Sequence, residues 1–321
     1  MRGFVTRGRF DPRIDGLFSG QWKLEERGKR SDAVLKRLML GQIELKRQLA
    51  AQEASLRRED PDEVRVVART PAYARSDPRI SVLIPLYNHA EEVRSALASV
   101  AISEHQALEV VVLDDASSDR SQEAVLEFFA EHAHLPALLV EHVVNRGLGR
   151  ARNDLVESAR GELVFMLDAD NEIYPTALAR LADALDEDPE AFFAYPMLEE
   201  HIDGEPHTLR SFFPWEPGRL AESNYIDAMS LLRRRELLDL GGYTEDPRLH
   251  GWEDYDLWCR TAQRGLRGVL VPEILARYRR ADHSMLYSIT NVDTSDAESL
   301  LRARYPVLTE RRSEAEEATP P

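Results

Sequence analysis

The sequence predicts an α/β fold, in which a sheet of strands carries helices on both faces. Three observations indicate this fold. Short apolar runs alternate with helical patterns from Ile80 onward, polar residues gather directly after each apolar run, and 321 residues suffice to bury a sizeable core. Alternation of this kind favours parallel pairing through right-handed crossovers. Ligands are therefore expected at the carboxyl ends of the strands.

Four apolar runs are predicted to be strands, and the stretches between them are predicted to be helices. The strands are Ile80–Ile84, Glu109–Leu113, Leu138–Val143 and Leu163–Leu167. The helices are Glu91–Val100, Gln122–Glu131 and Gly149–Ala159. After Pro196 the pattern loosens into an aromatic loop at Phe212–Trp215, a strand near Ala228–Leu232 and a helix through Asp256–Arg264.

We expect three parts along the chain: a helical extension and linker over 1–78, a main domain over 79–290, and a C-terminal segment over 291–321 that ends in a disordered tail. In the first part, leucines fall on a seven-residue repeat between Leu35 and Leu56, which predicts a long amphipathic helix. That helix either packs against the main domain or joins two chains as a short coiled coil, and the sequence leaves both open.

The composition narrows the choice of partners and compartment. The chain has 57 acidic and 41 basic residues and a net charge of -16, which would repel a phosphate backbone, so no nucleic-acid partner is expected. One cysteine, Cys259, permits no intrachain disulfide, and no apolar run of about 18 residues is long enough to span a bilayer. We expect a cytoplasmic protein, and the basic first sixty residues leave peripheral contact with the inner face of the membrane open.

The acidic triplet Asp168, Ala169, Asp170 comes directly after the fourth predicted strand. Paired carboxylates suit Mg²⁺ or Mn²⁺, which can also bridge a substrate diphosphate. Such triplets are common in turns and helix caps, so the position after a buried strand carries the argument. His283, late in the chain, is a candidate for a further metal ligand.

Two further polar clusters follow the second and third predicted strands. Asp119 and Gln122 have capping-box spacing, but the adjacent Asp114 and Asp115 repel each other, which argues for an external partner such as a base or a ribose hydroxyl. After the third strand, two glycines precede Arg152 in the first turns of a helix, where it faces either a nucleotide or solvent. This cluster falls short of a dinucleotide fingerprint.

The stretch Gly251–Trp258 packs three carboxylates between two tryptophans. A solvated helix start favours acids, because the helix dipole attracts negative charge there. An indole beside a carboxylate also forms a sugar-stacking wall with a general base. Glu253 and Asp254 are the candidate catalytic residues.

These segments, in this order, resemble the glycosyltransferase family 2 enzymes, which have the GT-A fold. The resemblance covers about Ile80 to Leu286 and rests on seven ordered segments: Ile80–Asn88, Asp114–Asp119, Ala151–Asn153, Asp168–Asp170, Asn224–Ile226, Gly241–Tyr243 and Glu253–Trp258. It implies a mixed, Rossmann-like sheet flanked by helices. The N-terminal region and the acidic tail lie outside it.

Carried over to this sequence, the resemblance implies a donor site and a catalytic base. The nucleotide would be held by Pro85, Tyr87, Asp114, Asp115 and Arg152. Asp168 would meet the ribose or the metal, Asp170 would ligate Mn²⁺ or Mg²⁺, and His283 stands near a second ligand position. Asp254 falls at the position of the base that deprotonates the acceptor hydroxyl, so the anomeric configuration would invert.

The implied activity is transfer of a sugar from a nucleoside-diphosphate sugar to a carbohydrate or glycolipid acceptor, in synthesis of a bacterial-type surface glycan, glycolipid or glycoconjugate. One alternative is a non-catalytic glycosyltransferase-like scaffold dimerised by the Leu35–Leu56 helix. Another is a sugar nucleotidyltransferase, which would need a glycine-rich loop where Pro85–Asn88 stands. A haloacid-dehalogenase phosphatase would need a small residue in place of Glu172.

Overall fold

The structure is a computed structural model that describes residues 63–280, 295–306 and 308, together with 41, 45 and 48. Most of the predicted leucine-repeat helix, the C-terminal tail and His283 lie outside the described residues. Predictions about dimerisation, membrane contact and a histidine metal ligand therefore stay predictions.

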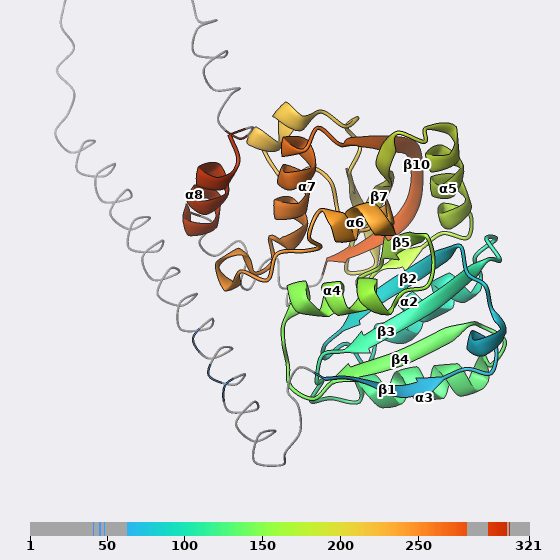
Figure 1. Ribbon diagram of the computed structural model, residues 1–321. Coiled ribbons are helices and arrows are strands. Elements are labelled where there is room, and N and C mark those ends of the chain that lie inside the picture. Colours follow the sequence, from blue (N-terminus) through green and yellow to red (C-terminus); the bar gives the residue numbers. More distant parts are fainter. Residues whose placement is uncertain are drawn as a thin grey trace, which may run out of the picture.

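One mixed sheet forms the centre of the protein (Figure 1). Its strands lie in the order β1-β4-β3-β2-β5-β9-β7-β10-β6, and β8 pairs with β7 alone. The strand bounds are β1 Val64–Arg69, β2 Ile80–Leu86, β3 Leu108–Asp114, β4 Ala137–His142, β5 Leu163–Met166, β6 Glu172–Ile173, β7 Ala191–Ile202, β8 Glu205–Arg210, β9 Leu231–Arg233 and β10 Arg267–Arg280.

Parallel pairing dominates the half of the sheet that the sequence predicted. Strand β2 pairs in parallel with β3 and β5, and β3 pairs in parallel with β4. In the other half, β9 runs antiparallel to both β5 and β7, while β7 and β10 pair in parallel. The α/β fold with a mixed sheet is confirmed.

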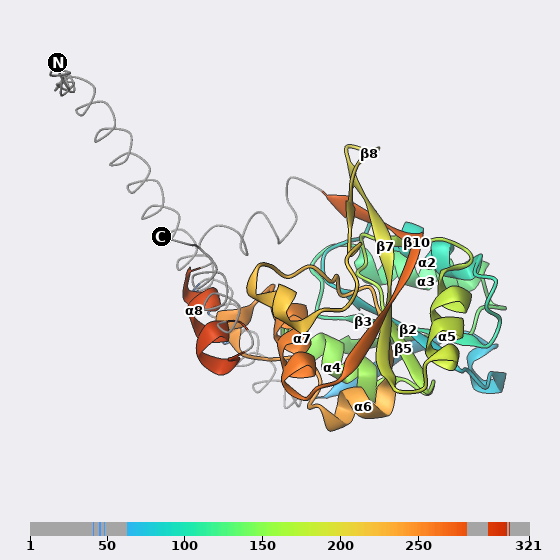
Figure 2. The same ribbon diagram turned by 90° about the horizontal axis from the view of Figure 1, so that it is seen from above.

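Helices cover both faces of this sheet, as the two views show (Figures 1 and 2). Val82 and Ile84 of β2 belong to one core cluster, with α2, α3 and α5, whereas Leu83 between them belongs to the other, with α4, α6, α7 and α8. This alternation is the period of two of a strand buried on both faces. The helix bounds are α2 Val93–Ala101, α3 Ser121–Glu131, α4 Leu148–Ser158, α5 Ala177–Glu187, α6 Arg234–Asp239, α7 Glu253–Gln263 and α8 Ser295–Arg304, with short 3₁₀ turns η1 Tyr73–Arg75, η2 Pro217–Ala221 and η3 Pro247–Leu249.

The predicted elements after Pro196 needed correction. Pro196 lies inside β7, where the pairing with β10 shifts register near Val271, because proline has no N–H for the ladder. The helix predicted from Asp256 begins at Glu253. None of the helices in the described part of the chain is long and apolar enough to cross a membrane.

Candidate active site

The carboxyl ends of β2 and β3 are tied to each other by their following turns. The Asp115 N–H donates to the Leu86 carbonyl at 2.8 Å, and the Asn88 side chain accepts from the Ser118 N–H at 2.8 Å. Tyr87 precedes this turn and keeps 44% of its surface exposed, whereas Pro85 is buried in β2. Of the residues predicted to bind the base, Tyr87 is thus the one whose ring is open to a ligand.

Asp114 and Asp115 have partners within the protein, which corrects the expectation that their repulsion requires an external one. Asp115 is buried, and its carboxylate accepts from the N–H groups of Arg146 at 2.7 Å and Gly147 at 2.8 Å. Asp114 accepts from the Ser117 N–H at 3.1 Å, and burial raises its pKa. Their contact with a nucleotide base stays a prediction.

Arg152 points from α4 into the protein, which excludes the solvent-facing orientation that the sequence left open, while its contact with a nucleotide stays a prediction. Its side chain is 4% exposed, its guanidinium donates to Asp168 Oδ1 at 2.9 Å, and it lies 5.3 Å from the centre of the Tyr243 ring. Its Nε has no hydrogen-bond partner among the described residues. A buried cation at the carboxyl edge of the sheet suits a diphosphate.

Asp168 and Asp170 lie just beyond β5, both partly exposed. Burial, together with the negative charge of Asp168, raises the pKa of Asp170 to about 6. Two adjacent carboxylates supply the hard oxygen donors that Mg²⁺ and Mn²⁺ prefer, so this pair fits a divalent cation. Within residues 63–280 and the described part of 295–308, no three His, Cys, Asp or Glu side chains come together as a metal-binding group.

Asn153, next to Arg152 on α4, anchors the loop that follows Gly242. Its Nδ2 donates to the Tyr243 carbonyl at 3.0 Å and its Oδ1 accepts from the Tyr243 N–H at 2.7 Å. Gly242 has a φ of +67°, and a Cβ added there would lie 2.4 Å from Asn153 Oδ1. The loop and α4 therefore fit together only with a glycine at this position.

We expect Gly242→Ala to destabilise the protein by about 2–4 kcal/mol, which combines left-handed backbone strain with displacement of the Asn153 hydrogen bonds. Gly265→Ala is the matched control, because Gly265 has a φ of +68° and nothing within 4 Å of an added Cβ. The control should cost only the strain, about 1–2 kcal/mol. Urea unfolding of both variants measures the difference, and equal losses would contradict the close approach of Asn153.

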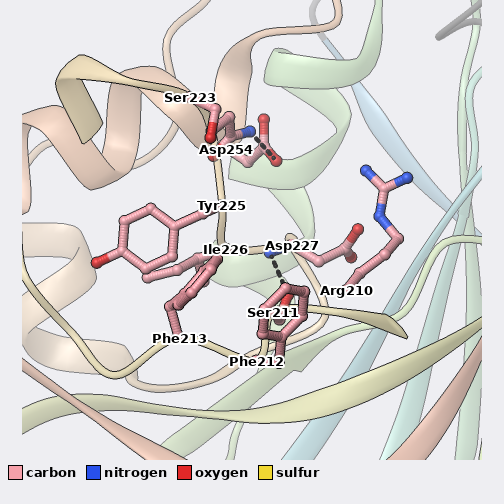
Figure 3. A pocket seen from close by; sticks show the side chains of 10 residues that line it. Arg210, Ser211, Phe212, Phe213, Ser223, Tyr225, Ile226, Asp227 and Asp254 are labelled. Atoms are coloured by element: carbon pink, nitrogen blue, oxygen red, sulfur yellow. Dashed lines mark hydrogen bonds between the residues drawn. The ribbon is translucent and has the colours of Figure 1, made fainter. Parts of the chain in front are cut away.

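Asp254 faces a cavity of about 240 Å³ beside the start of α7 (Figure 3). Asn224 donates to its carboxylate at 3.0 Å. Burial raises the pKa of Asp254, and the positive charge of Arg152 opposes that rise. The cavity is lined by Arg210, Ser211, Phe212, Phe213, Ser223, Asn224, Tyr225, Ile226, Asp227 and Asp254.

Glu253, Trp252 and Trp258, which the sequence grouped with Asp254, do not line the cavity. Glu253 is buried, does not line the cavity, and has a pKa raised by burial. Trp258 is fully buried, and its indole N–H donates to the Ile226 carbonyl at 2.9 Å, so it belongs to the core and forms no sugar-stacking wall. Trp252 stacks on Tyr255 with ring centres 5.5 Å apart.

Two charged residues of the cavity, Arg210 and Asp227, were not predicted. Figure 3 shows both side chains on the same side of the cavity. Burial raises the pKa of Asp227 to about 6, against the opposing charge of Arg210. Ser211 follows Arg210, and its hydroxyl accepts from the Asp227 N–H at 3.0 Å. It has a φ of +54°, a strained backbone of the kind found at functional sites. The sequence signals near these residues were the aromatic loop at Phe212–Trp215 and the Asn224–Ile226 motif, and neither includes Arg210 or Asp227.

The family model for Glycosyl transferase family 2 matches residues 81–239, a segment that includes β3, β5 and the turns that follow β2, β3 and β5. The chain belongs to glycosyl transferase family 2. Among the curated relatives of this family 2 chain is the O-antigen biosynthesis protein RfbC of Myxococcus xanthus, 30% identical over 62% of this chain and 16% of the relative. Of three such relatives the chain spans 31, 21 and 16% of the length.

Solved structures share the fold of this family 2 chain. S. aureus TarS 1-349 in complex with UDP-GlcNAc has a TM-score of 0.56 at 20% identity, covering 64% of this chain and 60% of TarS. The mannosyltransferase PcManGT of Pyrobaculum calidifontis, in complex with GDP-Man and Mn²⁺, has a TM-score of 0.53 at 20% identity, covering 91% and 88%. The family 2 chain therefore has the GT-A fold.

Proposed function

We propose that this protein transfers a sugar from a nucleoside-diphosphate sugar to an acceptor hydroxyl, with inversion at the anomeric carbon and with the aid of a divalent metal. The observation that carries the proposal is the position of Arg152. Its buried charge acts on both Asp168 at the sheet edge and Asp254 in the cavity. A donor held at Asp168 would have its reacting carbon close to Asp254.

On the donor side, Asp168 and Asp170 would hold Mn²⁺ or Mg²⁺, and Arg152 adds a fixed positive charge. When bound, such a cation offsets the negative charge that builds up on the departing diphosphate. The ligands bound to the two structural relatives, UDP-GlcNAc in one and GDP-Man with Mn²⁺ in the other, support a nucleotide-sugar donor and a metal. Tyr87, exposed beyond β2, would meet the base.

On the acceptor side, Asp254 would take the proton from the acceptor hydroxyl, and the hydroxyl oxygen would attack the anomeric carbon opposite the leaving diphosphate. This single displacement inverts the configuration and needs no covalent enzyme intermediate. Phe212 and Phe213 are 44% and 36% exposed on the cavity wall, where their faces suit a sugar ring. A carbohydrate or glycolipid acceptor fits this wall.

The O-antigen biosynthesis protein among the relatives supports a role for this transfer in the synthesis of bacterial surface glycans. The reaction would take place in the cytoplasm or at the inner face of the membrane, contacted through the basic first sixty residues. This location, like homodimer formation through the N-terminal helix, is part of the proposal.

Thermal unfolding with nucleotides and metal tests the donor site. UDP or GDP with MnCl₂ should raise the unfolding temperature by several degrees, because a ligand at a hundred times its Kd adds about 2.7 kcal/mol to the stability of the folded state. Nucleotide with EDTA should give a smaller shift. Absence of any shift with UDP, GDP, CDP and dTDP, each with Mn²⁺, would contradict the proposed function.

A further inference from the structure

A buried histidine lies between two carboxylates at the end of β4, at the same edge of the sheet as the end of its parallel partner β3. The ring of His142 is fully buried. Its Nδ1 lies 2.6 Å from Asp115 Oδ1, and its Nε2 lies 2.8 Å from Asp154 Oδ2. Asp115 follows β3 and Asp154 belongs to α4, so one ring joins a strand end to a helix.

The two contacts fix the protonation state of this ring. An ionised carboxylate only accepts hydrogen bonds, and a neutral imidazole has one N–H, so both contacts are satisfied only by the doubly protonated ring. Burial alone would lower the pKa of His142, but the hydrogen bonds to Asp115 and Asp154 raise it. The other charges that face this group are Arg150 and Arg146, whose nitrogens lie 2.8 and 3.7 Å from Asp154 Oδ2.

His142 contacts a carboxylate that binds the backbone at the start of α4. The carboxylate of Asp115 accepts the N–H groups of Arg146 and Gly147, the residues that lead into the helix. Gly147 is its N-cap, with a φ of +85°. Asp154 lies in α4 itself, two positions after Arg152, and its carboxylate contacts the other ring nitrogen of His142. His142 therefore fixes α4, the helix from which Arg152 donates its hydrogen bond to Asp168.

We propose that His142 is a positioning residue whose imidazolium clamps the β4–α4 turn and α4 onto the end of β3 and so holds Arg152 in place beside Asp168. The effect of His142 on donor binding rests on the proposed function, whereas its hold on the β4–α4 turn does not. A group whose pKa is raised by folding stabilises the fold fully below its unfolded value, about 6.5, and less as the pH rises through the folded value. The turn should therefore loosen on the alkaline side.

The test compares His142→Asn with His201→Asn. His201 is a matched control, because it is also nearly buried and pairs with Glu199 at 2.7 Å, but it lies at the far end of β7. Amide hydrogen exchange, corrected for intrinsic rates, is measured for Arg146 and Gly147 between pH 6 and pH 9. We expect protection in the wild type to fall as the pH rises, and in His142→Asn to be low throughout, with the control unchanged from the wild type.

The same three proteins are titrated with UDP and Mn²⁺. We expect the Kd of His142→Asn to rise roughly tenfold at pH 6, the scale of one charge-assisted hydrogen bond, and the difference from the wild type to shrink at pH 9. If no protein binds UDP, the proposed donor site fails while the exchange data still decide the clamp. Wild-type exchange behaviour in His142→Asn would overturn the inference.

A measurement on the unaltered protein covers the case in which His142→Asn does not fold. In ¹⁵N spectra assigned through bonds, both ring nitrogens of His142 should carry protons at pH 7. A neutral ring at that pH would overturn the inference by itself.

Discussion

Asp254→Asn is expected to reduce sugar transfer by roughly 10² to 10⁴, the usual cost of losing a general base, while nucleotide affinity changes by less than about twofold. Asparagine keeps the shape of the side chain and its contact with Asn224, but its amide cannot accept the acceptor proton at neutral pH. The effect should fall on the transfer step, because Asp254 lines the proposed acceptor cavity and its side chain is bonded to Asn224.

Initial rates of transfer and UDP titrations of the same preparations measure the two parts of this expectation. Asp203→Asn is the matched control, because Asp203 lies exposed in the β7–β8 turn with a φ of +51°, which asparagine tolerates. A parallel loss of UDP binding in Asp254→Asn would place this residue in the donor site and would contradict its role as the base.

The pH dependence of the wild-type rate follows from the same carboxylate. The base acts when ionised, so activity should rise with pH through the pKa of Asp254. Burial raises that pKa, although Arg152 opposes the rise, so the acid limb should lie above the usual range of an aspartate.

Asp170→Asn is expected to abolish the metal-dependent part of turnover, a loss of at least about 10² if the cation supplies several kcal/mol of transition-state stabilisation. The substitution removes one of the two carboxylates that would hold the metal and leaves the Arg152–Asp168 pair intact. Nucleotide binding without metal should therefore persist, whereas the extra thermal shift produced by Mn²⁺ should disappear.

Asp183→Asn, an exposed change on α5, serves as the control for Asp170→Asn because it removes the same charge far from the sheet edge. Rates and thermal shifts are measured over a series of Mn²⁺ concentrations. An unchanged metal requirement in Asp170→Asn would show that the cation is held by other residues.

The sequence predicted the half of the sheet whose strands are buried on both faces. Every residue of β2 and β3 is buried, and such strands appear as continuous apolar runs. It did not predict β7 and β10 as long strands. Strand β7 opens with the buried apolar run Ala191–Tyr195, but Pro196 interrupts this run in the middle of the strand. In β10 only Val271, Leu275 and Ala276 are buried, so this strand has neither a continuous buried run nor a strict alternation.

Some site residues could be predicted from local motifs, whereas others are brought together only by the fold. Asp168 and Asp254 stand in short local motifs, which a sequence displays directly. His142 has no such signal, since its partners lie 27 and 12 residues away and are brought to it only by the pairing of β3 with β4 and the packing of α4. Arg210 and Asp227 are likewise joined by the fold, across the loop that carries Phe212.

The walls of the proposed acceptor cavity come almost entirely from two short stretches, 210–213 and 223–227, which lie at the end of β8 and in the loop before β9, outside the parallel core. The residues of the proposed donor site, by contrast, stand at the ends of β2, β3 and β5. These strands are buried, so a changed residue there disturbs the core. We therefore expect the acceptor preference to differ more among relatives than the nucleotide requirement does. The 210–227 segment is accordingly the unit to exchange in an experiment that aims to change the proposed acceptor preference.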